Sequence, residues 1–318
     1  LLLFYYHEYN VLFYDNCTLG NIMKIMYYRG KYPNFGDELN TWMWQKILPD
    51  FFDENEKELF IGIGSTIGNY YNNSAKKIIF GAGFVPTYNE KPDVHTPDWD
   101  IYFVRGPRTA KLLGISPDLA LGDAAILLRT VVDLTKKTPD VISFMPHWES
   151  LECGNWEKTC QIAGINLIDP RRPVEEVINE LLRSKLVICE AMHGAIVSDA
   201  FRIPWIPVLP LNHIHREKWF DWAEALDLEI KSHRLFPSKI LPPIIDKTTR
   251  NSLWQKLKNY IKYLLSKKIF DKTIIYLSAI RLSNIAKKKS CLSADSKIDR
   301  ITEEMLKKVQ QLHRDYRK

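Results

Sequence analysis

The segment Val187-Ile188-Cys189-Glu190-Ala191-Met192-His193-Gly194-Ala195-Ile196-Val197-Ser198-Asp199-Ala200 determines the predicted fold. Its apolar start belongs to a predicted buried strand, Leu186–Cys189, and its end opens a predicted helix, Ala195–Phe201. His193 and Gly194 lie between the two. Parallel sheets are built from such strand-turn-helix units and bind ligands at the carboxyl ends of their strands, so we expect a site at this turn.

The same pattern extends outward in both directions. The predicted strands are Ile25–Tyr28, Leu59–Ile63, Lys77–Phe80, Ile101–Val104, Leu119–Leu121, Val141–Phe144, Ile165–Ile168, Leu186–Cys189 and Trp205–Leu209. The predicted helices are Glu38–Ile47, Pro107–Leu113, Ala124–Leu128, Val174–Arg183, Ala195–Phe201 and Lys218–Leu226. A polar stretch at 133–139 separates the two series. We therefore predict an α/β protein with two Rossmann-like domains, 23–135 and 136–243, and a cleft between them.

Composition fits a soluble globular protein of more than one domain. The 318 residues are 46% hydrophobic and 26% charged, which gives no compositional case for disorder. The five cysteines show neither a CxxC pair nor metal-binding spacing, so we expect reduced thiols in a cytoplasmic protein. The first 22 residues lack the features of a signal peptide, and the strand pattern starts at Met23, which suggests a natural start there.

A basic segment follows the second predicted domain. Residues 247–289 contain twelve Lys and Arg and the single acid Asp271, and apolar residues recur among them at helical spacing. We predict that 244–318 is a basic amphipathic helical tail that rests on an anionic membrane surface. The alternative is a helical cap whose apolar stripe packs on the body. We expect no nucleic-acid partner.

The first predicted strand is followed by a polar turn. In Asn34-Phe35-Gly36-Asp37, Gly36 permits close backbone approach and the helix that follows offers free amide groups. Asp37 fits a helix N-cap, or, with Asn34, a group that holds acceptor hydroxyls or acts as a base. Both alternatives stay open.

Three further turns of the first half are rich in glycine. They are Gly62-Ile63-Gly64-Ser65, Gly81-Ala82-Gly83-Phe84 and Arg105-Gly106-Pro107-Arg108. Glycine is common in turns after strands, so each motif alone is weak evidence. Together the three motifs suggest a ligand that crosses the strand ends. Arginines at a helix start can bind phosphate or carboxylate through paired hydrogen bonds, so Arg105 and Arg108 are predicted ligand-binding residues.

The second half offers further polar groups at strand ends. His147 follows one strand, and Arg171 and Arg172 precede a helix. His193 has a side chain whose ordinary pKa suits proton transfer, and Glu190 stands three residues before it. His213 and His215 follow the last strand without an evident third metal ligand.

Four of these motifs, in this order and spacing, resemble the polysaccharide pyruvyl transferases, particularly the succinoglycan-type branch. They are Asn34-Phe35-Gly36-Asp37, Gly81-Ala82-Gly83-Phe84, Arg105-Gly106-Pro107-Arg108 and Glu190-Ala191-Met192-His193-Gly194-Ala195. The resemblance covers roughly residues 24–210. In some members a basic residue stands two places before the histidine, where this chain has Ala191. The donor-binding cation must then come from Arg105, Arg108, Arg171 or Arg172.

The resemblance implies a glycosyltransferase-B-like fold, phosphoenolpyruvate as donor and ketal formation on two sugar hydroxyls. The expected catalytic residues are His193, Asp37 and Glu190. The expected substrate-binding residues are Asn34, Gly36, Gly64, Ser65, Gly81, Gly83, Arg105, Arg108, His147, Arg171, Arg172 and Gly194. We expect no cofactor and no metal, because arginines can balance the charge of the donor.

Two other classes of function share these features. A nucleotide-sugar glycosyltransferase of surface polysaccharide synthesis has the same predicted fold and cleft. A noncatalytic scaffold at the membrane surface would need only the basic tail. We predict the transferase, acting on a polysaccharide or its lipid-linked precursor, in the cytoplasm or on the cytoplasmic membrane face.

Overall fold

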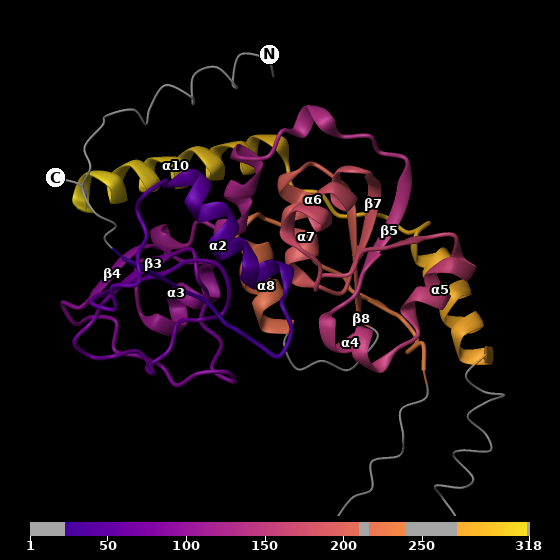
Figure 1. The fold of residues 1–318 in the computed structure, drawn as a ribbon, viewed down its shortest axis with the longest axis horizontal. Helices are drawn as coiled ribbons and strands as arrows, with labels where there is room; N and C mark the ends of the chain where they lie inside the picture. The colour runs from indigo at the N-terminus through magenta and orange to yellow at the C-terminus, as the bar shows by residue number, and fades with distance from the viewer. Residues whose placement is uncertain (1–22, 210–215, 240–271, 317–318) are drawn as a thin grey trace, which may run out of the picture.

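The computed structural model describes residues 23–209, 216–239 and 272–316 (Figure 1). In the first half, four parallel strands lie side by side in the order β1-β2-β3-β4. Their bounds are β1 Lys24–Met26, β2 Glu58–Ile61, β3 Lys76–Phe80 and β4 Trp99–Phe103. The helices of this half are α2 Phe35–Ile47 and α3 Pro107–Leu113, with 3-10 turns η2 Pro117–Leu119, η3 Ala124–Thr130 and η4 Leu134–Lys136.

The second sheet is also parallel and has the order β6-β5-β7-β8-β9. Its strands are β5 Val141–Met145, β6 Asn166–Leu167, β7 Ser184–Cys189, β8 Trp205–Leu209 and β9 His233–Arg234. Its helices are α4 Trp148–Cys153, α5 Trp156–Ala163, α6 Val174–Leu182, α7 Met192–Ala200 and α8 Arg216–Ala225. Counted along the chain, the strand order is 2-1-3-4-5, which reverses direction between β5 and β7. In open α/β sheets ligands bind at this reversal, and here the segments that carry His147 and His193 leave the sheet.

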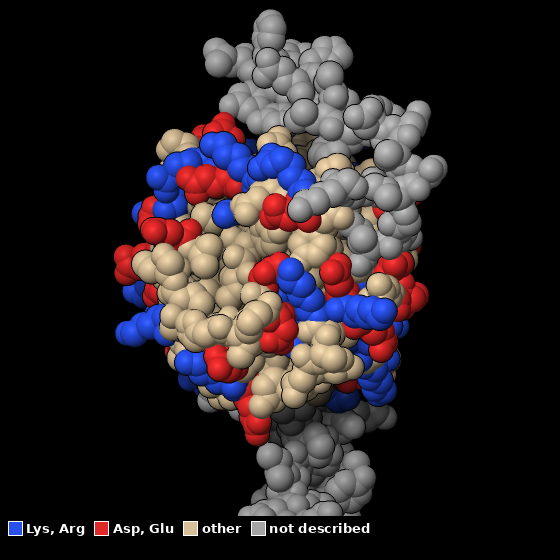
Figure 2. Space-filling model, turned by 90° about the vertical axis from the view of Figure 1, so that its left-hand side faces the viewer, with Lys and Arg blue, Asp and Glu red and all other residues tan. Residues whose placement is uncertain are grey.

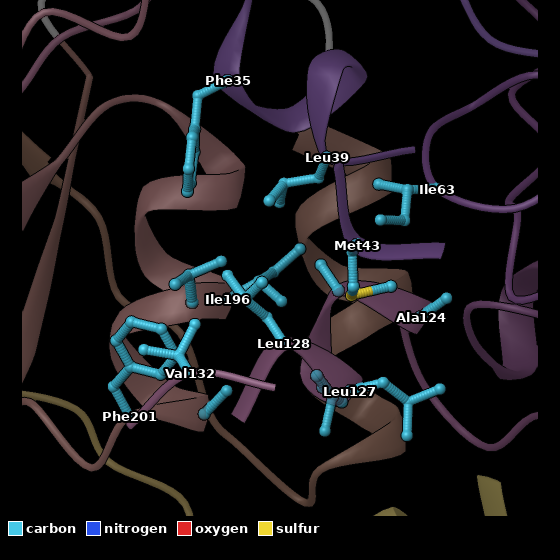
Figure 3. Packing of buried hydrophobic residues seen from close by; sticks show 14 of the residues in the cluster. Phe35, Leu39, Met43, Ile63, Ala124, Leu127, Leu128, Val132, Ile196 and Phe201 are labelled. Atoms are coloured by element: carbon cyan, nitrogen blue, oxygen red, sulfur yellow. The ribbon is translucent and has the colours of Figure 1, made fainter. Parts of the chain in front are cut away.

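The two halves share one hydrophobic core. Phe35, Leu39 and Met43 of α2 pack toward α7 and η3, as Figure 3 shows. Spacing of three or four residues places these side chains on one face of α2. The backbone amide of Phe35 also donates a hydrogen bond of 2.7 Å to the carbonyl of Pro170 in the second half. The start of α2 is therefore fixed against both halves.

The C-terminal segment packs on both halves. Residues 272–285 are helical, and Ala279, Leu282 and Ile285 are buried, the last two in a cluster on the second sheet. The final helix, α10 (Asp295–Tyr316), runs back across the molecule to β4 (Figure 1). There Tyr316 donates a hydrogen bond of 2.8 Å to Asp100. Where the structure describes the tail, one apolar face thus covers the body while Tyr276, Leu277 and Ile280 stay exposed. Residues 244–271 of the predicted membrane segment lie outside the described residues.

Most predicted elements are confirmed to within a few residues, and three predictions need correction. The predicted strand Leu119–Leu121 is wrong: Ser116 caps a 3-10 turn there, and only Ala120 bridges to Val104. Predicted helix Ala124–Leu128 is a 3-10 helix capped by Asp123. Helix α7 begins at Met192, so His193 stands inside its first turn rather than before it.

The surface shows charges of both signs. Figure 2 views the side of the first half, where Lys and Arg alternate with Asp and Glu around an uncharged area. Across the described ranges, none of the helices has the length and apolar character needed to cross a bilayer.

Candidate active site

His193 marks the point where the two halves meet. Its imidazole lies directly against Gly36, because a Cβ atom built on Gly36 would stand 1.9 Å from Nδ1 of His193. Only 13% of the histidine side chain is exposed. Gly36 is therefore needed for contact between the first turns of α2 and α7, and not for an unusual backbone angle. This geometry brings together two predicted site residues that are distant in the sequence.

Burial and neighbouring cations hold His193 neutral. Loss of hydration, followed by the charges of Lys218 and Arg105, lowers the pKa of His193 to about 3. Its Nε2 atom lies 3.9 Å from Oδ2 of Asp123, and among the described residues neither buried atom has a hydrogen-bond partner. Burial raises the pKa of Asp123 to about 6. Buried polar atoms ordinarily have a hydrogen-bond partner, so these two unpaired atoms mark a candidate position for a polar ligand.

Arg105 adds a third unpaired group. Its side chain is 0% exposed, and Nη1 donates a hydrogen bond of 2.7 Å to Oγ of Ser65. Nε donates a hydrogen bond of 2.9 Å to Oδ2 of Asp221 on α8. In the part of the chain that the structure describes, Nη2 has no hydrogen-bond partner. A buried guanidinium with a free N–H group is suited to bind an anion.

Lys218 supplies a second cation from the first turn of α8. Burial lowers its pKa to about 8, with a further contribution from the charge of Arg105, while Asp37 and Glu149 act in the opposite direction. At neutral pH the amine is therefore mostly protonated. The charges of Lys218 and Arg105 both lower the pKa of His193, and the charge of Arg105 also lowers the pKa of Lys218, so these cations lie near the histidine.

Asp37 of α2 adds a carboxyl group near Lys218. Asn34 donates a hydrogen bond of 2.7 Å to its Oδ2 atom, so the predicted pair is confirmed as neighbours. The N-cap role is not seen, because Asn34 occupies that position without a side-chain cap bond. Burial raises the pKa of Asp37 to about 6, against the opposing effects of Asn34 and Lys218. A carboxyl group with this pKa can exchange a proton near neutral pH.

The glycine turns bring backbone close to these groups. Gly64 has φ +117°, and its absent Cβ would lie 3.8 Å from Oδ1 of Asp37. At Gly83 a Cβ would stand 2.1 Å from Cζ of Arg105, so the guanidinium lies against this glycine. Gly81 instead makes room for Ala124, and its φ of +96° suits glycine. Gly64, Ser65 and Gly83 thus border the cluster, whereas Gly81 supports the turn behind it.

Glu190 and His147 hold the start of α4. Oε1 of Glu190 accepts a hydrogen bond of 2.6 Å from Oγ of Ser150, and Oε2 accepts one of 2.9 Å from the backbone amide of His147. Burial raises the pKa of Glu190 to about 7. His147 is the N-cap of α4. These contacts favour a positioning role for Glu190 over proton transfer.

The remaining predicted arginines pair with carboxylates other than those of the cluster. Arg108 donates hydrogen bonds to Glu224 and Glu217 on α8. These carboxylates, Glu224 first, hold the pKa of Arg108 above its usual range. Arg171 forms an ion pair of 2.7 Å with Asp169, and exposed Arg172 lies 3.6 Å from Glu176. Gly194 allows Met145 to pack against α7. Arg105 is thus the predicted arginine that the structure brings to His193.

Sequence reasoning missed Lys218, Asp123, Asp221 and Tyr88. Tyr88 lies near Arg105, Asp37 and Glu149, and burial raises its pKa to about 12. The Gly122-Asp123 pair after a predicted strand was the one available signal. Nothing in the spacing of α8 marks Lys218 or Asp221. His213 and His215 lie outside the described residues. Within the described ranges, no three His, Cys, Asp or Glu residues are grouped to hold a metal ion.

Comparisons with known proteins identify the family of this chain. The family model for polysaccharide pyruvyl transferase matches residues 19–212. This chain belongs to the polysaccharide pyruvyl transferase family. The succinoglycan biosynthesis protein ExoV of Rhizobium meliloti (strain 1021) is 37% identical over 216 residues, which cover 67% of this chain and 68% of that protein. The predicted family is confirmed, and the chain is a transferase that acts in pyruvyl transfer to polysaccharide.

The contact between Gly36 and His193 gives a first test of the transferase. In the Gly36→Ala variant the new methyl group must displace the imidazole, and a shift of about 1 Å at a reacting group can lower turnover about 100-fold. We expect turnover near that of His193→Ala, with little further loss when both substitutions are combined. Turnover assays on the three folded variants measure this. Wild-type turnover in Gly36→Ala, or additive losses in the double variant, would contradict it.

Proposed function

We propose that this transferase moves the pyruvyl group of phosphoenolpyruvate onto two hydroxyls of one sugar in a surface polysaccharide or its lipid-linked precursor, forming a ketal. The observation that carries the proposal is the buried Nη2 atom of Arg105, unpaired among the described residues and near Lys218 and His193. The donor carries a phosphate and a carboxylate. Two cations in a buried site suit such a ligand.

The reaction needs a proton on the methylene carbon of the donor and the loss of phosphate. Two sugar hydroxyls each form a bond to the central carbon, one hydroxyl proton ends on the new methyl group, and the other ends on phosphate. Asp37 accepts a proton from the acceptor in this proposal. His193 is neutral without donor, and the negative charge of bound donor offsets Lys218 and Arg105, which favours the protonated imidazole.

The arrangement of the two parallel sheets supports a glycosyltransferase-B-like fold as part of the proposal. The proposed site lies between them, at the carboxyl ends of β1, β2, β4 and β7. Donor and acceptor would then approach the junction from the two halves. The reversal of strand order next to β7 is where such sheets bind ligands.

Arg105 and Arg108 form a matched pair for testing the donor. Loss of a charge-assisted contact costs about 1.5–3 kcal/mol, so Arg105→Ala should weaken phosphoenolpyruvate binding about tenfold or more. Arg108→Ala should leave binding unchanged, because Arg108 pairs with α8 at the surface. Calorimetric titration with phosphoenolpyruvate measures both, and phosphate release with lipid-linked oligosaccharide fractions tests turnover. If a nucleotide sugar binds and phosphoenolpyruvate does not, the glycosyltransferase alternative holds instead.

The pKa values of Asp37 and Lys218 predict a bell-shaped dependence of kcat/KM on pH. Asp37 acts as a carboxylate, so activity is present above about pH 6 and is lost as pH falls through that value. Lys218 acts as an ammonium, so activity is present below about pH 8 and is lost as pH rises through that value.

Variants separate these limbs from titration of the donor phosphate. Asp37→Asn should lower kcat/KM, and the part of its fall below about pH 6 that comes from protonation of Asp37 should disappear. Lys218→Arg should move the alkaline limb upward, because arginine stays charged. An alkaline limb that stays in place in Lys218→Arg would contradict the assignment.

We also propose that the transferase rests on an anionic membrane at the cytoplasmic face. Tyr276, Leu277 and Ile280 on helix 272–285 are 57%, 48% and 43% exposed, within the basic segment 247–289. Each Lys or Arg near such a surface contributes about 1 kcal/mol, and salt screens this attraction beyond about 8 Å.

Sedimentation with vesicles of anionic lipid tests this membrane contact. We expect binding that falls as salt rises and that is weaker in a Leu277→Ser, Ile280→Ser double variant. Lys307→Ala, an exposed change on α10, serves as the control. Equal sedimentation of the double variant and wild type would remove these residues from the contact.

A further inference from the structure

Asp221 of α8 receives three hydrogen bonds from the first half. Oδ1 accepts one of 2.9 Å from the backbone amide of Thr109. Oδ2 accepts one of 2.7 Å from Oγ1 of Thr109 and one of 2.9 Å from Nε of Arg105. The Asp221 and Arg105 side chains are 3% and 0% exposed, so this is a buried ion pair with added neutral donors. Such pairs stabilise only when the remaining groups are also satisfied, as they are for Asp221.

The carboxylate of Asp221 caps helix α3 from a distant part of the chain. Gly106 is the N-cap residue of α3 and has no side chain to accept a hydrogen bond. Thr109 is the third helical residue, whose amide an N-cap side chain would ordinarily bind. A Cβ at Gly106 would lie 1.9 Å from the backbone oxygen of Asp221. The glycine thus leaves room for α8 to approach and supply the missing cap.

The same carboxylate fixes the orientation of Arg105. With Nε held by Asp221 and Nη1 held by Ser65, the planar guanidinium has one remaining direction for its buried Nη2 atom. Gly83 lies against Cζ and blocks displacement toward that turn. Lys218 precedes Asp221 by three residues, so both lie on one face of α8.

We propose that Asp221 is a positioning residue for the donor site: it holds the guanidinium of Arg105 in the orientation that binds the anionic donor. Asp221 does not touch the donor and acts through Arg105. The inference rests on the proposed role of Arg105 in binding phosphoenolpyruvate. It adds a residue from outside the range matched by the family model, which ends at residue 212.

A double-mutant cycle tests the proposal. Asp221→Asn keeps an oxygen for the Thr109 amide but loses the charge that holds Arg105. When Arg105 is present, we expect Asp221→Asn to raise the Kd for phosphoenolpyruvate, measured by calorimetry, at least tenfold. In the Arg105→Ala background, the same change should alter Kd less than threefold. The control is Glu224→Gln. Glu224 lies on α8 like Asp221, but its carboxylate binds Arg108, so this variant should bind donor like wild type.

The outcomes are separable. Wild-type donor affinity in folded Asp221→Asn overturns the inference, and so does an equal loss with and without Arg105. If wild type itself does not bind phosphoenolpyruvate, the proposed donor is wrong and the inference falls with it. If Asp221→Asn does not fold, Thr109→Val decides: at nearly constant shape it removes the hydroxyl that donates to Oδ2 of Asp221 and accepts from the Phe84 amide. We expect about threefold weaker donor binding that depends on Arg105, and unchanged affinity overturns the proposal.

Discussion

The packing of α2 against α7 is the constraint on which the site depends. Each helix follows a parallel strand of its own half: α7 begins at Met192 soon after β7 ends at Cys189, and α2 begins at Phe35 after the loop that follows β1. Their apolar faces share one core with η3, so their first turns are held together. Helix N-termini carry partial positive charge, and two of them near one histidine oppose its protonation and favour an anion. The acids Asp37 and Glu38 in the first turn of α2 moderate that field.

Buried charge is costly, and this protein places several charged groups at one junction. The guanidinium of Arg105 is stabilised by Asp221 and Ser65, which satisfies two of its three nitrogen atoms. Nη2 of Arg105, Oδ2 of Asp123 and Nε2 of His193 are left without hydrogen-bond partners among the described residues. A core selected only for stability would pair or remove such atoms. Of the seven buried unpaired side-chain atoms among the described residues, these three belong to groups close enough to interact electrostatically, which is the physical argument for a bound polar ligand.

The sequence predicted what depends on local pattern. Strand-turn-helix units, the glycine turns and the place of His193 all follow from periodicity and turn chemistry within about fifteen residues. The pairing of Gly36 with His193 could not be predicted, because 157 positions separate them and only the shared core brings them together. Arg105 and Arg108 looked equivalent in the sequence, yet one is buried beside Asp221 and the other pairs with surface acids. Their difference comes from α8, whose position no local pattern specifies.

Helix α8 therefore has a larger part in the site than its sequence suggests. It follows the last long strand of the second half but packs on α3 of the first half, where Gly106 leaves room for it. This crossing brings Lys218 and Asp221 to a site whose other groups lie within the matched range 19–212. Without α8, Arg105 would lose its ion pair with Asp221, and removing one partner of a buried ion pair is strongly destabilising. Arg105 therefore depends on α8 for its counter-charge, and α8 depends on Arg105 and Thr109 for the partners of Asp221.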